Sequence, residues 1–130
     1  MLKKLTHIDK YIQRRQDLAE KYNTMLNNTN LILPEIMNGN KHAFYLYVVR
    51  HVKRNVIIEE LKKRNIIVNI SYPYPIHTMK GYRYLGYKKG DLPHTEKLSK
   101  EIFSLPLYPS LTDDEQKIVI KALIEILDEI

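Results

Sequence analysis

Apolar side chains recur at steps of three and four residues through the first part of the chain, with charged and amide side chains between them. This spacing predicts an amphipathic helix over residues 2–26, which the polar cluster at residues 27–30 ends. The helix starts at Met1 without a capping residue, so we expect the chain to enter in the middle of a structural element. Its apolar positions are Leu2, Leu5, Ile8, Ile12, Ala19, Tyr22, Met25 and Leu26.

Short runs of β-branched and aromatic residues predict strands in the middle of the chain. The clearest run covers residues 43–50, after a turn signal at residues 38–40. Two shorter runs, at residues 31–33 and 66–70, predict further strands. The sheet is therefore expected to be small.

Further helices are predicted between and after these strands. Residues 54–64 have a helical apolar spacing, and Asn65 suits a left-handed helix end. A short helix or turn is expected near residues 78–85, ending at Gly86, and another helix over residues 94–103.

The C-terminal part combines a proline-pinned segment with a marked helix start. Two prolines make residues 104–109 extended. Thr112 and Glu115 have the spacing of a capping box, which begins a final helix that runs through Leu127. Strands that alternate with helices predict an α+β fold in which helices cover a small sheet.

Composition agrees with one ordinary globular domain. The 130 residues are 44% apolar and 28% charged. No apolar run approaches the roughly 18 to 20 residues of a bilayer span, and no signal peptide is recognised, so we expect a cytoplasmic protein. The absence of cysteine excludes disulfides, thiolate zinc sites and cysteine nucleophiles.

The net charge of +6 is concentrated in the first half of the chain. Residues 1–65 carry 13 basic and 6 acidic side chains, and residues 66–130 carry 8 and 9, so the halves have net charges of +7 and −1. The densest basic stretch could face nucleic acid or a phosphorylated small molecule, or it could be a solvated face. It contains Arg50, Lys53, Arg54, Lys62, Lys63 and Arg64.

Patterns of catalytic and metal-binding residues are scarce. No two of the five histidines lie three or four residues apart on a helix, so a metal site is not expected. The four glycines match neither a dinucleotide loop nor a nucleoside-triphosphate loop, and no glycine-flanked serine is present. The pattern does not indicate a stand-alone enzyme.

Tyrosine, lysine and arginine are concentrated between Ser71 and Lys89. Pro73 and Pro75 exclude regular structure, so this stretch begins with a shaped loop. A cationic, aromatic loop can stack on a base and pair with phosphates, as a nucleotide or a single strand of nucleic acid requires. The alternative is that the tyrosines pack the loop and the charges keep it soluble.

An ordered series of motifs in the second half resembles the C-terminal part of the sugar-nucleotide aminotransferases of the DegT/DnrJ/StrS type. The predicted first helix is similar to the helix that joins the two domains of that family, and residues 43–49 to the first strand of its small domain. The resemblance therefore covers essentially the whole chain. The motifs are Ser71–His77, Tyr82–Tyr87, Gly90–Pro93, Glu96–Ser99, Ser104–Pro109 and Leu111–Thr112.

The resemblance implies the small domain of a fold-type-I enzyme, with a mostly antiparallel sheet. Members are usually homodimers that use pyridoxal phosphate to pass an amino group from glutamate to a nucleotide-linked keto sugar, in polysaccharide or amino-sugar biosynthesis. We expect residues 1–28 to be the interdomain helix and residues 29–130 the small domain, with the large domain absent. A fragment, a split gene product or an expressed sub-domain would start in mid-helix in this way.

The Schiff-base lysine and the cofactor-binding residues of the family lie in that large domain. The resemblance therefore implies no catalytic or cofactor-binding residue in this chain, and no catalysis by the chain alone. The expected partners are a large aminotransferase domain, or a second copy bound through the N-terminal helix, and a nucleotide sugar. A basic, tyrosine-rich module that binds nucleic acid is the alternative.

The Tyr-Pro-x-Pro-x-His loop of the family borders the active site and helps to position the sugar nucleotide. The alternative for the histidine is a hydrogen bond within its own domain that pins the loop. The corresponding substrate-binding residues are Tyr72, Pro73, Pro75 and His77. The sequence departs from the common family pattern at Tyr45, Asn65, Ser71 and Met79.

Overall fold

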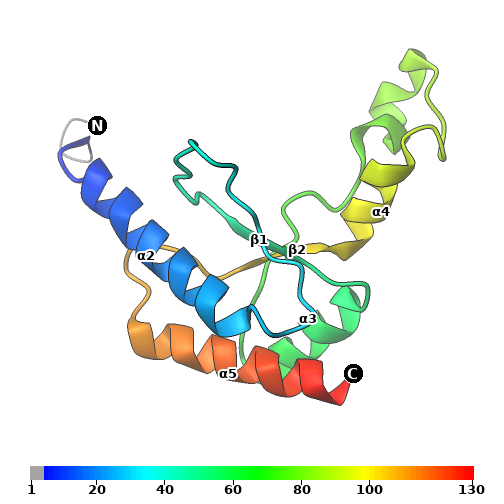
Figure 1. Cartoon of the computed structure of the whole chain (residues 1–130). Coiled ribbons are helices and arrows are strands. Elements are labelled where there is room, and N and C mark those ends of the chain that lie inside the picture. Colours follow the sequence, from blue (N-terminus) through cyan, green and yellow to red (C-terminus); the bar gives the residue numbers. More distant parts are fainter. Residues whose placement is uncertain (1–4) are drawn as a thin grey trace.

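An antiparallel pair of short strands lies at the centre of the computed structural model, which describes residues 5–130 (Figure 1). Strand β1 (Tyr47–Arg50) pairs with strand β2 (Ile102–Leu105), so that Tyr47 lies opposite Leu105 and Arg50 opposite Ile102. The pairing brings together segments that lie about half the chain apart. The α+β class predicted from the sequence is confirmed.

The two shorter predicted strands flank this pair as single bridges. Ile32 exchanges two hydrogen bonds of 3.0 Å with Arg50, and Asn69 pairs with Ser104 at the opposite edge. The prediction of strands over residues 31–33 and 66–70 is therefore wrong in extent, although both segments lie at the sheet. Pro34 has no N–H group to donate, which limits the first of these ladders.

The predicted strand over residues 43–50 begins only at Tyr47. Phe44 has a φ of 48°, in the left-handed region, so the backbone turns before the strand starts. The Phe44 side chain is buried, and its N–H group donates to Nδ1 of His42 at 2.9 Å. The left-handed turn at Phe44 interrupts the extended backbone, so the strand is shorter than predicted.

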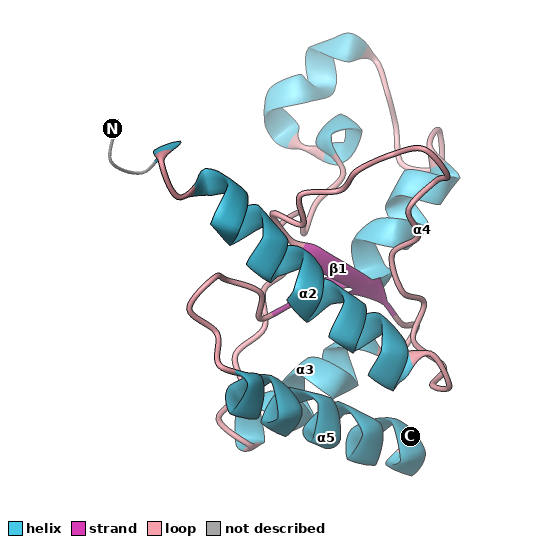
Figure 2. Cartoon of the chain, turned by 60° about the vertical axis from the view of Figure 1, so that its left-hand side comes forward, coloured by secondary structure: helices cyan, strands magenta, loops and turns pink. Residues whose placement is uncertain are grey.

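Three helices cover the sheet. Helix α2 (Ile8–Leu26) passes in front of β1 in Figure 2, and α5 (Asp113–Glu129) packs against both α2 and α3 (Arg54–Lys63). Tyr22 of α2 lies against Tyr47 of β1, with ring centroids 5.0 Å apart. The fully buried side chains of this core include Leu18, Tyr22, Leu26, Tyr47, Val49, Ile57, Leu61, Phe103, Leu123 and Ile126.

Two predicted helix ends are confirmed. Asn65 follows α3 with a φ of 60°, as a left-handed helix end requires. Thr112 caps α5: its hydroxyl accepts from the Glu115 N–H group, and the Glu115 carboxylate accepts from the Thr112 N–H group at 2.8 Å.

The buried face of α2 lies in its C-terminal half. Leu18, Ala19 and Tyr22 are buried, whereas Ile8 is 46% exposed. The prediction of one helix over residues 2–26 is wrong at its start, because a turn at residues 6 and 7 precedes α2, and Leu5, before that turn, is 57% exposed. Residues 1–4, including Leu2 of the predicted apolar stripe, lie outside the described residues. No helix within the described part of the chain combines the length and apolar character needed to cross a bilayer.

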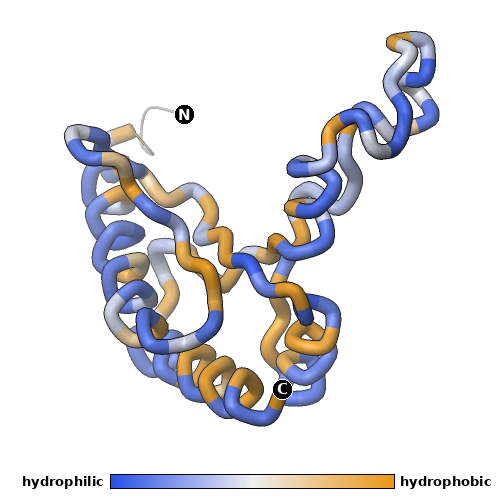
Figure 3. Tube along the Cα trace, turned by 45° about the vertical axis from the view of Figure 1, so that its right-hand side comes forward, coloured by the Kyte–Doolittle hydropathy of each residue, from blue (hydrophilic) through white to orange (hydrophobic). Residues whose placement is uncertain are grey.

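Residues 71–101, here called the arm, extend away from the rest of the molecule (Figures 1 and 3). The arm contains two 3-10 helices, η1 (Ile76–Thr78) and η2 (Lys80–Leu85), and helix α4 (Pro93–Glu101). Gly86 ends η2 with a φ of 80°, as predicted. The helix predicted over residues 94–103 stops at Glu101, because residues 102–105 pair with β1.

Candidate functional site

The loop that contains the predicted substrate-binding residues leaves the sheet edge after Asn69 and begins the arm. Tyr72 is 69% exposed, Pro73 is also exposed, and Pro75 is half-buried. Pro75 immediately precedes η1. The structure therefore places these three residues on one surface segment, where their side chains are accessible.

His77 differs from the other three because it is buried, with 6% of its surface exposed. Its Nε2 atom lies 2.9 Å from Oε1 of Glu96 on α4. This contact lies within the same domain, as expected by the alternative interpretation in which His77 pins the loop. The His77 ring is positioned by the arm itself.

Glu96 is the main residue of the site that sequence reasoning missed. Its Oε1 atom also accepts a hydrogen bond of 2.6 Å from the Gly90 N–H group. The hydrogen bond to His77, and then that to Gly90, hold the pKa of the Glu96 carboxyl below its ordinary value. The sequence identifies Glu96 only as part of the Glu96–Ser99 motif, and no local pattern pairs it with His77, which lies 19 positions earlier.

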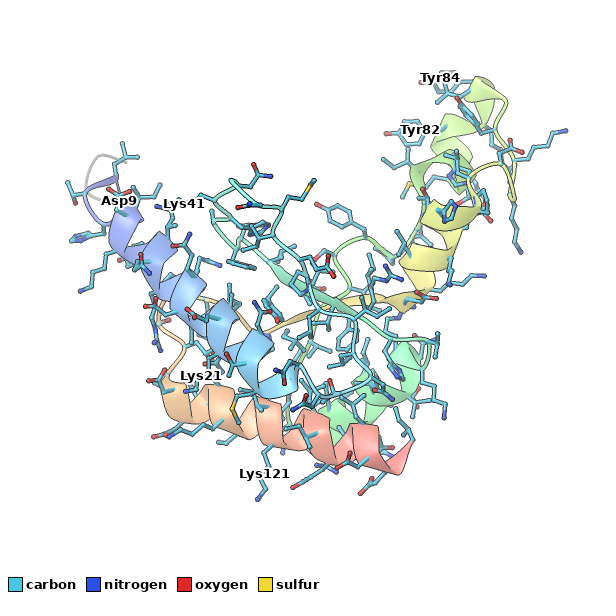
Figure 4. The ribbon with its side chains drawn as sticks, viewed as in Figure 1. Asp9, Lys21, Lys41, Tyr82, Tyr84 and Lys121 are labelled. Carbon is cyan, nitrogen blue, oxygen red and sulfur yellow. The ribbon has the colours of Figure 1, made fainter. Side chains whose placement is uncertain are left out.

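Large apolar side chains are exposed along the whole arm. Tyr84, at the far end, is 80% exposed, and Tyr82 lies close to it (Figure 4). Exposed basic residues lie in the same stretch, namely Lys80, Arg83, Lys88 and Lys89. The exposed apolar residues are Tyr72, Tyr74, Ile76, Tyr82, Tyr84, Leu85, Tyr87 and Leu92.

The base of the arm is held by arginines. Arg54 Nη1 donates to the Ser99 carbonyl at 2.7 Å and lies 3.3 Å from the Ile102 carbonyl, so it caps the C-terminal end of α4. Arg50 Nη2 lies 3.4 Å from Oε2 of the buried Glu101. These contacts fix α4 relative to the sheet.

Other residues of the basic stretch in the first half of the chain also have partners within the chain. Lys63 pairs with Glu60 at 2.6 Å, Arg64 with Glu125, and Lys53 donates to the Ile130 carbonyl at 3.0 Å. Three of the six charges, those of Arg50, Lys63 and Arg64, are paired with a carboxylate of the chain, whereas Lys53 and Arg54 donate to carbonyl groups. Half of the stretch is therefore paired within the chain, which reduces its support for a nucleic-acid module.

A shallow apolar hollow lies between α2 and α5, with Lys21 and Lys121 at its rim (Figure 4). Lys21 lies 3.8 Å from Asp113, and Lys121 lies 3.9 Å from Glu125. Three lysines, Lys21, Lys117 and Lys121, and one carboxylate, Glu125, line the hollow, so its rim has an excess of positive charge.

Residues 5–130 show neither a metal cluster nor a buried lysine. No group of three histidine or carboxylate side chains is placed to hold a metal ion within that range. Each lysine there is exposed or half-buried.

Comparison with known proteins finds one family that the chain resembles. The model of the DegT/DnrJ/EryC1/StrS aminotransferase family matches residues 1–124. A dTDP-3-amino-3,4,6-trideoxy-alpha-D-glucose transaminase from Micromonospora megalomicea subsp. nigra is 47% identical over 130 residues, which cover 96% of this chain and 35% of the relative. The chain spans about a third of the length of the curated relatives it matches.

Solved structures share the fold. DesV of S. venezuelae, in complex with a ketimine intermediate, superposes with a TM-score of 0.93 at 28% identity, covering 97% of this chain and 34% of that chain. NtdA of Bacillus subtilis, with bound cofactor PMP, superposes with a TM-score of 0.79 at 28% identity, covering 91% and 28%. The arrangement of helices, sheet and arm is thus that of one part of a larger aminotransferase.

Proposed function

The chain belongs to the DegT/DnrJ/EryC1/StrS aminotransferase family, and from this premise we propose that it is the C-terminal, substrate-binding domain of a sugar-nucleotide aminotransferase. In this role residues 1–28 join it to a large domain, and residues 29–130 form the small domain. The observation that carries the proposal is the 47% identity to a dTDP-amino-sugar transaminase along almost the entire chain. The substrate class is accordingly a nucleotide-linked keto sugar, with glutamate as the amino donor.

The large domain, rather than this chain, supplies the pyridoxal phosphate chemistry in the proposal. That cofactor delocalises the electrons of the carbon that exchanges its amino group, and it needs a desolvated lysine beside it. No lysine of residues 5–130 is buried. The chain alone is therefore proposed to be inactive.

The arm carries the substrate-binding role. Tyr72 and Pro73 are exposed, and Pro75 restricts the backbone that leads to His77. A loop ordered before the substrate arrives loses less conformational entropy on binding. Tyr72 offers an aromatic face and a hydroxyl to the sugar nucleotide, while His77 acts from within by keeping the loop in place.

The proposed partner surface includes the start of α2 and the residues just before it. Leu5 precedes the helix, Ile8 and Tyr11 lie in its first turns, and all three are more than 40% exposed. A large domain, or a second copy of the chain, would remove these side chains from water.

The test compares the chain alone with a chimera. In the chimera, this chain replaces the corresponding third of the Micromonospora relative. We expect the chimera to transfer the amino group of glutamate to a dTDP-keto sugar, and the chain alone neither to transfer it nor to bind pyridoxal phosphate covalently. Borohydride fixation of the cofactor to a lysine of the isolated chain would refute the assignment of the cofactor to the large domain. A folded, cofactor-loaded chimera without transfer would refute the proposed function.

The substrate-binding role of the loop is tested in the same chimera. Tyr72→Ala is expected to raise the KM for the nucleotide sugar about tenfold, because it removes a contact made by bound substrate. Tyr84→Ala removes a tyrosine of similar exposure at the far end of the arm and is the control. Equal KM values for the two variants would remove Tyr72 from the site.

A further inference from the structure

The arm holds its shape with almost no hydrophobic core. Across residues 71–100, His77 is the only residue that is buried. Eight large apolar side chains of the same segment are exposed, among them Tyr72, Tyr74 and Ile76. Because apolar burial contributes little here, the geometry of the loop depends on polar contacts.

Three of these contacts meet at Glu96. Its Oε1 atom is 2.9 Å from His77 Nε2 and 2.6 Å from the Gly90 nitrogen. Its own N–H group donates to the Leu92 carbonyl at 3.1 Å. Glu96 thus joins η1, the turn around Gly90 and the first turn of α4, which we call the Glu96 clamp.

The clamp is attached to a fixed support. Helix α4, which carries Glu96, is capped by Arg54 at its other end and lies beside the Arg50–Glu101 ion pair. The loop from Tyr72 to Pro75 has no comparable contact of its own with the sheet after Asn69. Apart from its covalent connection to Asn69, the loop is therefore linked to the sheet by polar contacts that run through α4 and Glu96.

A carboxylate suits this position for a chemical reason. An ionised carboxylate only accepts hydrogen bonds, and one of its oxygens can receive two donors at once. Bonds to an ionised acceptor are also shorter and stronger than those between neutral groups. A glutamine of the same size keeps one acceptor oxygen but loses the charge.

We propose that Glu96 is a positioning residue for nucleotide-sugar binding, which holds His77 and the Gly90 turn so that Tyr72 meets the substrate. The proposal rests on the proposed function of the loop. Glu96 touches neither the substrate nor the reacting atoms, and it acts through His77. Its loss therefore weakens substrate binding and leaves the chemical step unaltered.

The kinetic test uses Glu96→Gln and Glu96→Ala in the chimera. Both variants are expected to raise the KM for the nucleotide sugar, by about fivefold and about thirtyfold, while kcat stays within a factor of two. Lys100→Gln changes an exposed residue of the same helix that is outside the clamp, and both constants should be unchanged. A fall in kcat at unaltered KM would overturn the positioning role.

The structural test uses the 130-residue chain alone and so does not depend on the chimera. Glu96→Gln should speed hydrogen exchange of the Gly90 amide about tenfold, since that amide donates to the carboxylate. The Lys100→Gln variant should match the wild type. Unchanged Gly90 exchange would show that the clamp does not form, and faster exchange with an unaltered KM would show that it is only structural. Either result overturns the proposal.

The two tests separate this proposal from the proposed function. If the wild-type chimera is inactive, the proposed function is refuted, and with it the role of Glu96 in substrate binding. If the Gly90 amide of the isolated chain still exchanges slowly, the clamp itself is present. If Glu96→Ala does not fold, Glu96→Gln still decides both measurements, because it preserves side-chain size and one acceptor.

Discussion

Arg15 connects three segments that are distant along the chain. Its Nη1 atom lies 3.1 Å from the Phe44 carbonyl and 3.0 Å from those of Tyr45 and Leu107. These carbonyls belong to the turn before β1 and to the segment after β2. Nη1 carries two N–H groups, so three carbonyls around it share those two donors.

Replacement of Arg15 by alanine should therefore destabilise the fold. We expect Arg15→Ala to lower the free energy of unfolding by about 2 kcal/mol, since the partly buried carbonyls lose a charged donor. Arg15→Lys keeps the charge and the donors, but its flexible ammonium group is not fixed in the plane of a guanidinium, so we expect only part of the loss to be recovered. Urea denaturation measures the change.

Lys10→Ala is the control for Arg15, since Lys10 is an exposed basic residue of the same helix. Its urea midpoint should equal that of the wild type. Similar midpoints for Arg15→Ala and Lys10→Ala would show that the bonds to the three carbonyls contribute nothing measurable.

Helix α5 begins with a group of carboxylates whose pKa values are lowered in the folded chain. The Thr112 N–H group and hydroxyl hold the pKa of Glu115 below its ordinary value. Arg14, by a hydrogen bond and its charge, and then Lys21 do the same for Asp113. The exposed N–H groups of the first helical turn also favour negative charge at this end.

These shifts predict the sign of a pH effect on stability. A carboxyl whose pKa is lower in the folded state stabilises the fold above its unfolded value, near 4, and this contribution is lost as the pH falls through the folded value. We expect the free energy of unfolding to decline below about pH 4. The double variant Asp113→Asn, Glu115→Gln should show a shallower decline in urea titrations between neutral and acidic pH.

Asp128→Asn, at the exposed C-terminal end of α5, is the matched control for the pH effect. It should follow the wild-type decline. Parallel curves for the double variant and the wild type would contradict the assignment to the α5 N-terminus.

The whole molecule combines a closed core with an apolar surface that stays open to water near the start of α2. Leu18, Tyr22 and Leu26 of α2 are inside the core, but Ile8, at the first turn of this helix, and Leu5, which precedes it, are not. Burial of an aliphatic side chain of this size stabilises an association by about 1.5 to 3 kcal/mol before ordering costs. The isolated chain should therefore associate with itself, and dimers or larger species should appear in sedimentation.

Ile8→Glu should shift that association toward monomer, because it places a charge in the contact. Val52→Glu, at a position that is 76% exposed in the turn between β1 and α3, should leave the association unchanged. A monomer at high concentration, with the first residues of α2 protected from proteolysis, would show that the α2 surface is satisfied within one copy.

Features set by neighbours in the chain followed from the sequence alone. The Thr112–Glu115 capping box, the left-handed Asn65 and Gly86, and helix α3 are all present where predicted. Each depends on backbone chemistry within four residues, so the local pattern suffices to determine it. The family resemblance, which rests on ordered motifs, likewise needed no coordinates.

The tertiary structure decided features that depend on distant partners. The left-handed turn at Phe44 makes β1 shorter than the predicted strand. Residues 102 and 103, predicted as the end of a helix, pair with β1 and are strand. Two arginines of the basic stretch pair with carboxylates far along the chain, Arg50 with Glu101 and Arg64 with Glu125. At the site, the irregular backbone at Pro73 and Pro75 was predictable from the sequence, whereas the Glu96 clamp was not. His77, Gly90 and Glu96 come together only because the arm folds back on itself. Local sequence patterns do not predict such contacts between residues that are distant along the chain.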